Sequence, residues 1–462
     1  MVIGVIGIIL SLILLMYLAY KGVSVLVLAP VLACFAALMG GIGTGQVHLL
    51  ATYTEVFMKS LGGYVMNYFP IFLLGAIFGK VMDDSGAAKA IANVICKSLG
   101  EKRAIAAIVI ACAILTYGGV SLFVVAFAVY PIAAELFREL GIPKRFIPGA
   151  IALGSFTFTM TALPGTPQIQ NAIPMQYFGT DVYAAPIIGL IASALMFFGG
   201  VSWLQFRAGK AMAKGEGYGS HKDEGIVKFD TDSLPSFGTS IIPIIVVLGL
   251  GFVLSKFIFP SMDLSYLETY KTTPEKVIGK WSLIVSLVIS IILAFTLNYK
   301  KMENPMETLT KGVSGSFLAI MNTASEVGYG NVIAGLAAFA VIKGALLGLS
   351  SNPLVAEAVS VSSLAGITGS ASGGLSIALG ALGEVYLKEA LARGINPQVL
   401  HRIAVIACGG LDSLPHNGAV ITLLGVTGLT HKESYADIGM CTVIIPSVTV
   451  IIVITLASFG II

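Results

Sequence analysis

Charged residues are scarce in this chain of 462 residues: they make up 11% of it, against about 25% in an ordinary soluble domain. Hydrophobic residues make up 56%, and the mean hydropathy is +0.92. Long runs without any charge occur at 1–20, 23–43 and 439–462. Each run is long enough to cross a hydrocarbon core of about 30 Å. The composition excludes a soluble domain and predicts an all-α polytopic membrane protein.

Motifs for several kinds of chemistry are also missing. The five cysteines are scattered and show neither metal-ligand spacing nor a disulfide framework. No Gly-x4-Gly-Lys-Ser/Thr motif is present for ATP-driven transport, and no His-Glu-x-x-His motif for a metalloprotease. Neither an arginine-rich voltage sensor nor a potassium-channel filter occurs. We therefore expect no enzyme activity, no catalytic residue, no metal, no cofactor and no nucleic-acid partner.

A polar stretch at 207–237 separates two sets of apolar spans and is the one clear linker. It is the most basic region of the chain, which places it in the cytoplasm by the positive-inside rule. The two parts that it separates, 1–206 and 238–462, have similar lengths. The basic residues in their connections imply opposite orientations, so we expect two inverted-topology repeats joined by a cytoplasmic linker.

A short motif, Gly-Gly-aliphatic-Ser, occurs once in each half, as Gly118-Gly119-Val120-Ser121 and as Gly373-Gly374-Leu375-Ser376. Each copy lies inside an apolar segment, 103–139 or 355–390, that would make a helix of about 55 Å. Segments of that length must fold back or break inside the membrane. We therefore expect re-entrant hairpins or broken helices, with the breaks at Thr116–Gly119 and Gly369–Gly374.

A second pair of interruptions lies downstream of the glycine pairs, at Thr161–Gln168 and Asp412–Gly418. Pro164 and Pro415 lack a backbone donor and kink or end a helix. Apolar runs flank both clusters, so we expect them at membrane depth rather than in an external loop. Corresponding breaks in two halves are the sequence pattern of a secondary transporter's binding site.

Broken helices expose free N–H groups at the start of the next helix, where the macrodipole favours an anion. Small residues at such places also serve helix packing in membranes, and a single copy of the motif would favour that interpretation. Because the motif is duplicated, we favour a binding site for a carboxylate substrate. The residues that we expect to hold the substrate are Gly118, Gly119, Ser121, Thr161, Thr166, Gly373, Gly374, Ser376 and Asn417.

Two acidic residues interrupt apolar segments, Asp412 and Glu326. An ionisable group at the centre of a spanning helix costs at least about 2.5–3.5 kcal/mol, so it usually faces a cavity and has a function. We expect Asp412 to carry the coupling proton or cation, with His416 or Glu326. The alternatives are a structural hydrogen bond for Asp412 and an ion pair with Lys343 for Glu326.

Other polar residues favour structural interpretations. Asp83 and Asp84 follow an apolar run and precede Ser85-Gly86, which indicates the end of one helix before the start of the next. His401 begins an apolar run beside Arg402, which is typical of residues at the membrane interface.

Several of these stretches resemble a known family. They are Leu74–Ala88, with the signature Asp-Asp-Ser-Gly-Ala-Ala, the Thr116–Ser121 break, and Leu414–Gly418 running into Ile421-Thr422. At these residues, and over nearly its whole length, the chain resembles the gluconate permease (GntP) family of the ion-transporter superfamily. The combination of Leu414–Gly418 with Ser325–Gly330 is similar to members associated with short hydroxy acids such as 3-hydroxybutyrate.

The resemblance implies cation-coupled uptake, usually proton symport, of small hydroxy-carboxylates across the inner membrane. It also implies paired hairpins, a scaffold, a mobile transport domain and a homodimer. We take 1–45 and 238–298 as the scaffold. The predicted function is secondary active transport, a proton-coupled symport of a small (hydroxy)monocarboxylate such as 3-hydroxybutyrate or gluconate. The expected partners are that carboxylate and the lipid bilayer.

Two alternatives remain at this point. A sodium-coupled carboxylate symporter is the nearer one, because hydroxyl-rich breaks offer oxygen ligands for Na⁺. An intramembrane hydrolase is the distant one, because it needs a nucleophile with a base, and only Asp412 with His416 offers such a pair.

Overall fold

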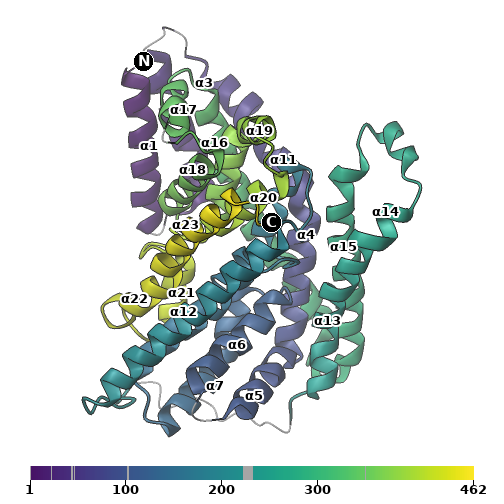
Figure 1. Cartoon of the computed structure of the whole chain (residues 1–462), viewed down its shortest axis with the longest axis vertical. Helices are drawn as coiled ribbons and strands as arrows, with labels where there is room; N and C mark the ends of the chain where they lie inside the picture. Colours follow the sequence, from purple (N-terminus) through teal and green to yellow (C-terminus); the bar gives the residue numbers. More distant parts are fainter. Residues whose placement is uncertain are drawn as a thin grey trace.

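The computed structural model describes residues 2–21, 23–42, 45, 47–100, 103–221, 233–348 and 350–462. All regular structure in this part of the chain is helical (Figure 1). Six of its helices are long and apolar enough to cross a membrane, and a pair bent by 94° makes up to seven. The predicted all-α polytopic class is confirmed.

The first half contains the helices up to the predicted linker. They are α1 (Val2–Tyr20), α2 (Val25–Ile42), α3 (Leu49–Ala51), α4 (Met58–Asp84), α5 (Ala87–Leu99), α6 (Ala104–Tyr117), α7 (Leu122–Glu139), α8 (Ile147–Ser155), α9 (Phe158–Thr161), α10 (Ile169–Ala172), α11 (Met175–Phe178) and α12 (Pro186–Met212). A π-helical turn joins α3 to α4, so the two form one long span. Helix α4 ends at Asp84, as the sequence predicts.

The second half repeats a similar succession. Its helices are α13 (Phe237–Val253), α14 (Phe259–Ser261), α15 (Pro274–Leu297), α16 (Pro305–Gly335), α17 (Phe339–Gly348), α18 (Pro353–Thr368), α19 (Ala371–Ala392), α20 (Pro397–Cys408), α21 (Gly418–Thr427), α22 (His431–Gly439) and α23 (Ile445–Ser458). Three of them begin at an Asn-Pro pair whose asparagine Oδ1 accepts a first-turn N–H: α16, α18 and α20. Proline suits the first helical position because the N–H that it lacks has no partner inside the helix.

Both overlong apolar segments break in the predicted stretches: the first at the pair Gly118-Gly119, and the second at Gly369-Ser370, so that the pair Gly373-Gly374 lies in the first turn of α19. The first becomes α6 and α7, and the second becomes α18 and α19. The second segment folds back on itself, because a Cβ added at Gly374 would fall on the backbone of Ala365. Further from the tip, Ser360 Oγ and the Tyr386 hydroxyl lie 2.7 Å apart across the same helix pair. The predicted re-entrant hairpin is therefore present in the second half.

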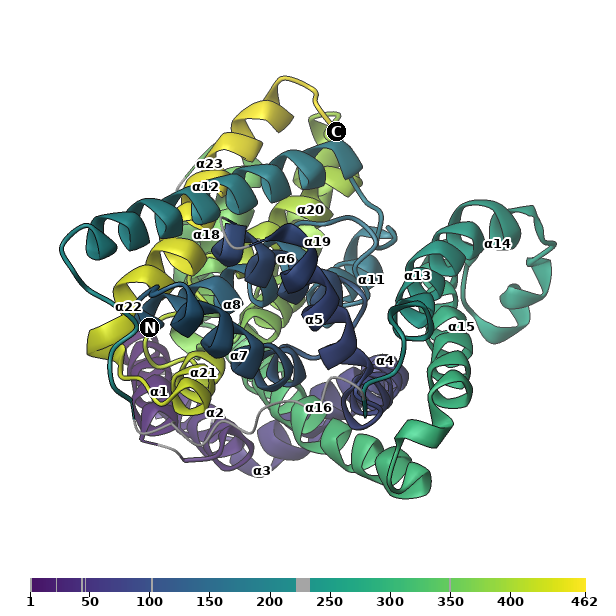
Figure 2. The ribbon, with the colours of Figure 1, turned by 90° about the horizontal axis from the view of Figure 1, so that it is seen from below.

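Helices α4 and α16 lie side by side and run in opposite directions (Figure 2). The C-terminal Asp84 of α4 accepts a hydrogen bond from Thr308, near the start of α16. In the middle, the rings of Phe69 and Phe317 lie 5.7 Å apart. Corresponding helices of the two halves are thus antiparallel, which is the arrangement that inverted repeats produce.

Outer helix pairs flank this central pair. Helix α1 packs on α2, which packs on α16, while α13 packs on α15, which packs on α4. Figure 1 shows α13 and α15 as a separate pair along one side of the molecule. Helix α12 continues to Met212, so the first part of the predicted linker 207–237 is helical. Residues 222–232 of that linker lie outside the described residues.

Candidate functional site

The two breaks of the first half pack together as one unit. Gly119, with φ of +93°, leaves the space that Pro167 fills; an added Cβ would lie 3.0 Å from Pro167 Cγ. The side-chain amide of Gln168 donates to the Thr116 carbonyl at 2.8 Å. The Tyr117 hydroxyl donates to the backbone of the Thr161–Gln168 segment at 2.7 Å. The α6–α7 turn and the downstream break are therefore held together by direct contacts.

The second half joins its two breaks in the same way. Asn417 donates from Nδ2 to the Gly369 carbonyl at 2.8 Å, and its Oδ1 accepts the first N–H groups of α21. His416 Nε2 lies 3.1 Å from the Gly366 carbonyl oxygen. At Gly369, φ is +63°, and an added Cβ would lie 2.9 Å from the His416 ring. Asn417 and His416 thus fasten the downstream break to the hairpin tip between α18 and α19.

The downstream breaks of the two halves also meet. A Cβ on Gly409, which caps α20, would lie 2.8 Å from Cγ2 of Thr161. Thr161 is buried, and its hydroxyl donates to the Thr157 carbonyl at 3.1 Å. Thr166 is also fully buried, and its Oγ1 has no hydrogen-bond partner in the described part of the chain. This junction is the place where polar groups from both halves come together.

The two hairpin tips do not meet. The backbone nitrogen of Ser121 lies 3.5 Å from the position of a Cβ on Gly79 of α4. Ser376 is buried beside the Tyr64 hydroxyl, at another level of the same helix. Gly79 and Tyr64 are about 22 Å apart along α4 at 1.5 Å per residue. The sequence led us to expect that Ser121 and Ser376 face one common carboxylate. In this conformation they do not.

We expected the N–H groups of the glycine pairs to bind the substrate, but in the structure they form hydrogen bonds within the protein. Gly118 and Gly119 donate to the carbonyls of Ile114 and Thr116. Gly373 and Gly374 donate to Ser370, one to its hydroxyl oxygen and one to its carbonyl. These four groups are engaged in closing the helix ends, so they hold no carboxylate in this conformation. The donors left for a ligand are the N–H groups in the first turns of α7 and α19 that close no such bond.

Glu326 is a residue of α16, and its side chain lies against the start of α19. It is 5% exposed, and its Oε2 has no hydrogen-bond partner among the residues that the structure describes. A Cβ added at Gly373 would fall on this oxygen, and the Ser370 hydroxyl lies beside the same carboxyl group. Among the described residues, Lys343 makes no ion pair with Glu326. The alternative of a Glu326–Lys343 ion pair is therefore not observed.

Asp412 lies in the turn that follows α20. It is 8% exposed, and its Oδ1 accepts a hydrogen bond from Ser413 Oγ at 3.0 Å. The Tyr435 hydroxyl, from α22, donates to the Ser413 carbonyl at 3.0 Å and closes the turn. His416 is bonded to Gly366 instead of Asp412, although the two side chains are four residues apart. The break is an irregular turn rather than a helix, so four-residue spacing does not bring the side chains together.

Three buried residues, His401, Arg402 and Glu357, were assigned wrongly or overlooked in the sequence. Arg402 and His401 are fully buried rather than interfacial. The Arg402 guanidinium donates to the carbonyls of Ala162, Val182 and Ala184 and to Asn171 Oδ1, at 2.8–3.2 Å. The detectable signal was a cation inside an apolar run; its partners come from the other half, so no local pattern shows them.

Glu357, on α18, is the other overlooked residue. It is fully buried, and within the described ranges neither of its carboxyl oxygens has a hydrogen-bond partner. It lies toward the Tyr386 end of the hairpin, away from the tip. It therefore belongs to the wall of the hairpin rather than to the breaks.

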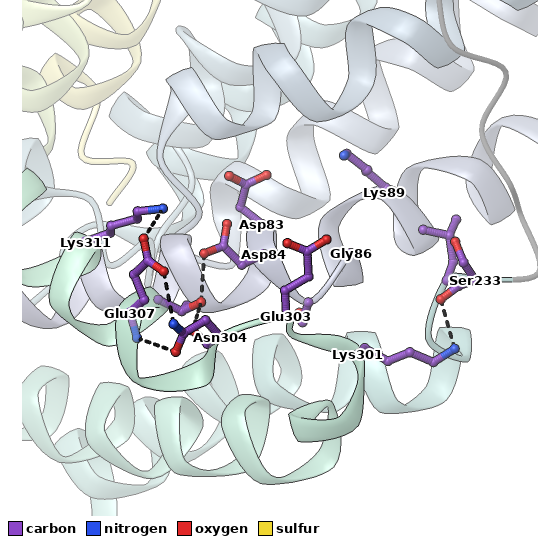
Figure 3. A pocket seen from close by; sticks show the side chains of 13 residues that line it. Asp83, Asp84, Gly86, Lys89, Ser233, Lys301, Glu303, Asn304, Glu307 and Lys311 are labelled. Atoms are coloured by element: carbon purple, nitrogen blue, oxygen red, sulfur yellow. Dashed lines mark hydrogen bonds and ion pairs between the residues drawn. The ribbon is translucent and has the colours of Figure 1, made fainter.

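A polar cavity of about 730 Å³ lies away from the breaks, where α4 ends and α16 begins (Figure 3). Its walls carry acids and lysines, among them Asp83 and Asp84 from α4, Lys89 from α5, and Glu307 and Lys311 from α16. Thr308 donates to Asp84 at 2.8 Å, and Lys311 pairs with Glu307 at 2.8 Å. Lys80, also on α4, pairs with Asp83 at 3.3 Å and with Asp84 at 2.6 Å, which agrees with the structural role predicted for the two acids.

Comparisons with known proteins agree with this architecture. The chain is 45% identical over 461 residues to the uncharacterized transporter YxjC of Bacillus subtilis, covering 95% of each chain. It is 30% identical over 195 residues to the gluconate permease of the same organism, covering 40% of this chain and 42% of that one. In fold, it is similar to the YdaH transporter of Alcanivorax borkumensis, with a TM-score of 0.59, 17% identity, and 89% and 90% coverage.

These relatives are transporters, so the intramembrane hydrolase is dropped as an alternative. The chain is a multi-pass membrane protein and not an enzyme. The model of the GntP family permeases matches residues 1–460, and the chain therefore belongs to that family.

Proposed function

We propose that this permease is a secondary active transporter that imports a small (hydroxy)monocarboxylate into the cell together with protons. Gluconate and 3-hydroxybutyrate are the substrates to test first. The family and the similarity to a gluconate permease support the substrate class. The inner membrane is the proposed location, with the linker 207–237 on the cytoplasmic side.

One observation supports the coupling most directly. Two buried acids, Glu326 and Asp412, lie at the breaks of the second half, and neither has a lysine or arginine partner among the described residues. A buried carboxylate without a cation costs several kcal/mol, so such a group binds a proton or a cation when water is excluded. The first half offers only hydroxyl and amide groups at its breaks. We therefore assign proton handling to the second half, to Asp412 with Glu326 or His416.

We place the substrate between the start of α19 and the point where the downstream breaks meet, two places that Asn417 joins through its bond to Gly369. Thr161 contacts Gly409 there, Thr166 has a buried hydroxyl without a described partner, and Asp412 follows on the second-half side. Ser121 and Asn417 border the same connected set of breaks. Ser121 and Ser376 would approach one ligand only in another conformation, which fits a mechanism in which one bundle moves against a scaffold.

Sodium coupling is the second candidate, because three oxygen atoms close together along α16 have no hydrogen-bond partner in the part of the chain that is described. They are Asn322 Oδ1, Ser325 Oγ and Glu326 Oε2. Oxygen ligands of this kind suit a hard cation. The proposal of a homodimer rests on the family alone and is tested by the mass of the purified protein in detergent.

Uptake into proteoliposomes separates the two couplings. We expect labelled gluconate or 3-hydroxybutyrate to accumulate under an inward proton gradient in sodium-free buffer. Unlabelled lactate, butyrate and citrate, added as competitors, define the substrate range. Accumulation under a sodium gradient alone, with equal pH on both sides, would contradict proton coupling. Equal internal and external substrate under every gradient would contradict active transport.

A further inference from the structure

Helix α19 begins inside the protein, with first-turn N–H groups that close no hydrogen bond among the described residues. It has 22 residues and begins at the hairpin tip, with Ser370 as its N-cap. The Ser370 hydroxyl accepts only the Gly373 N–H, and the N–H groups of Ala371 and Ser372 have no partner in the described structure. Unpaired first-turn N–H groups and the macrodipole make such an end attractive to a carboxylate.

The side chain that lies against this end is itself a carboxyl group. Glu326 reaches from α16 to Gly373, and its Oε2 occupies the space that any Cβ at position 373 would need. Only glycine permits this approach. The carboxyl group is buried, is next to Ser370, and has one oxygen without a hydrogen-bond partner among the described residues. Glu326 thus lies where the sequence predicts the carboxylate of the substrate.

The corresponding position of the first half lacks such a group among the described residues. There, the start of α7 packs on Gly79 of α4, and a Cβ on that glycine would lie 3.5 Å from the Ser121 nitrogen. Ser121 accepts no capping hydrogen bond from its helix. The start of α7 therefore remains without an acidic side chain, whereas the start of α19 has one.

No charged group in the described structure neutralises Glu326. On α4, the titratable group that faces it is the Tyr64 hydroxyl, while Lys59 is on the surface and pairs with Glu55 at 2.7 Å. Helix α2 carries Cys34 as its only titratable group. The other charged groups on the adjoining helices are Lys343 on α17, Glu357 on α18, Glu307 and Lys311 on α16, Lys80, Asp83 and Asp84 on α4, and Glu384, Lys388 and Glu389 on α19, more than ten residues beyond Gly373. His416 lies at the hairpin tip, where its Nε2 is 3.1 Å from the Gly366 carbonyl oxygen.

We propose that the ionised Glu326 carboxylate is an internal ligand of the α19 N-terminus and competes there with the carboxylate of the substrate. A proton that binds Glu326 removes its charge and frees the helix end for the substrate anion. When the substrate leaves and the proton is released, Glu326 returns to the helix end. This inference rests on the proposed function for its substrate class and adds the way in which proton and anion are coupled.

Amide hydrogen exchange tests the internal ligand without any substrate. It is measured on the purified protein in potassium buffer at pH 6 and pH 8, after correction for intrinsic exchange. We expect the amides of residues 371–374 to exchange about tenfold faster in Glu326→Gln than in the wild type at pH 8, because the charge at the helix end is lost. Equal protection in the two proteins at pH 8 would overturn the proposal.

Two further variants guard the interpretation. Gly373→Ala keeps the glutamate but fills its place, so it should behave like Glu326→Gln. Glu357→Gln is the matched control, since Glu357 is also buried, has no described hydrogen-bond partner, and lies away from the tip. The inference fails if Glu357→Gln loosens residues 371–374 as much as Glu326→Gln does.

Counterflow of labelled gluconate and 3-hydroxybutyrate at equal pH on both sides tests the competition. In the wild type, the half-saturation concentration for the substrate should increase with pH. Once Glu326 is mostly ionised, the increase should approach about tenfold per pH unit, because only the protein with protonated Glu326 binds the substrate. In Glu326→Gln it should not depend on pH in this way. Identical pH dependence in the two proteins contradicts the competition. Absence of counterflow by the wild type with either acid contradicts the proposed function, while the exchange experiment still decides the internal ligand.

Discussion

Thr161 of the first half packs directly on Gly409 of the second half: a Cβ on Gly409 would lie 2.8 Å from Thr161 Cγ2. Thr161 ends α9, and Gly409 caps α20. Asp412 follows Gly409 by three residues. The contact therefore keeps the Thr161–Gln168 break of the first half next to the Asp412–Gly418 break of the second half.

Gly409→Ala should strain this contact. Thr161 is buried and hydrogen-bonded, so its methyl group has little room to move, and we expect a loss of about 1–3 kcal/mol in stability. Thr161→Ser removes the methyl group and keeps the hydroxyl. The double variant should therefore recover part of the loss, because Oγ1 of residue 161 still lies 3.0 Å from the added Cβ; unfolding in detergent measures the effect. Additive losses in the double variant would show that the two residues are not coupled.

Asp412→Asn should abolish accumulation driven by a proton gradient while sparing exchange of labelled for unlabelled substrate. The amide has nearly the shape of the carboxyl group but cannot carry the coupling proton. Proteoliposome uptake and counterflow measure the two activities separately. Asp263→Asn, at an exposed position, is the control. Full uphill accumulation by Asp412→Asn would remove this residue from the coupling role.

Arg402→Leu should lower stability by about 3 kcal/mol or more, because buried carbonyls of Ala162, Val182 and Ala184 lose their donor. Arg402→Lys should restore little of it, since an ammonium group cannot reproduce the fork of donors. Thermal unfolding followed by intrinsic tryptophan fluorescence measures the effect. Arg393→Leu, at an exposed position, should be near neutral. A wild-type melting temperature for Arg402→Leu would disprove the structural role.

Asp437→Asn should loosen the contact between α12 and α22. The fully buried Asp437 accepts from Trp203 and Arg207 at 3.1 Å and lies 3.4 Å from the Arg145 guanidinium. Asparagine removes the charge from three hydrogen bonds that the buried carboxylate accepts, and we expect a loss of about 1.5–3 kcal/mol.

The matched control for Asp437 is Glu216→Gln. Glu216 pairs with the same Arg145 at 2.6 Å, but its side chain is 42% exposed, so the loss should stay below about 1 kcal/mol. Chemical unfolding in detergent compares the two variants. Equal losses would contradict the importance of burial at this site.

Local chemistry was enough to predict much of this fold. Hydrophobic runs must span a membrane, glycine-rich stretches break helices, and proline removes a backbone donor, wherever the rest of the chain lies. Both hairpin segments consequently break in the predicted stretches, the first at Gly118–Ser121 and the second at Gly369–Ser370. The family resemblance is confirmed for the same reason, because it rests on short continuous motifs.

Contacts between distant segments could not be predicted in this way. Arg402 is buried because its partners come from residues 162–184 of the other half, and Glu326 meets Gly373 because α16 packs on α19. The separation of Ser121 from Ser376 depends on which level of α4 each hairpin tip contacts. Periodicity and composition describe a segment and its immediate neighbours, whereas these relationships arise only when helices far apart in the chain pack together.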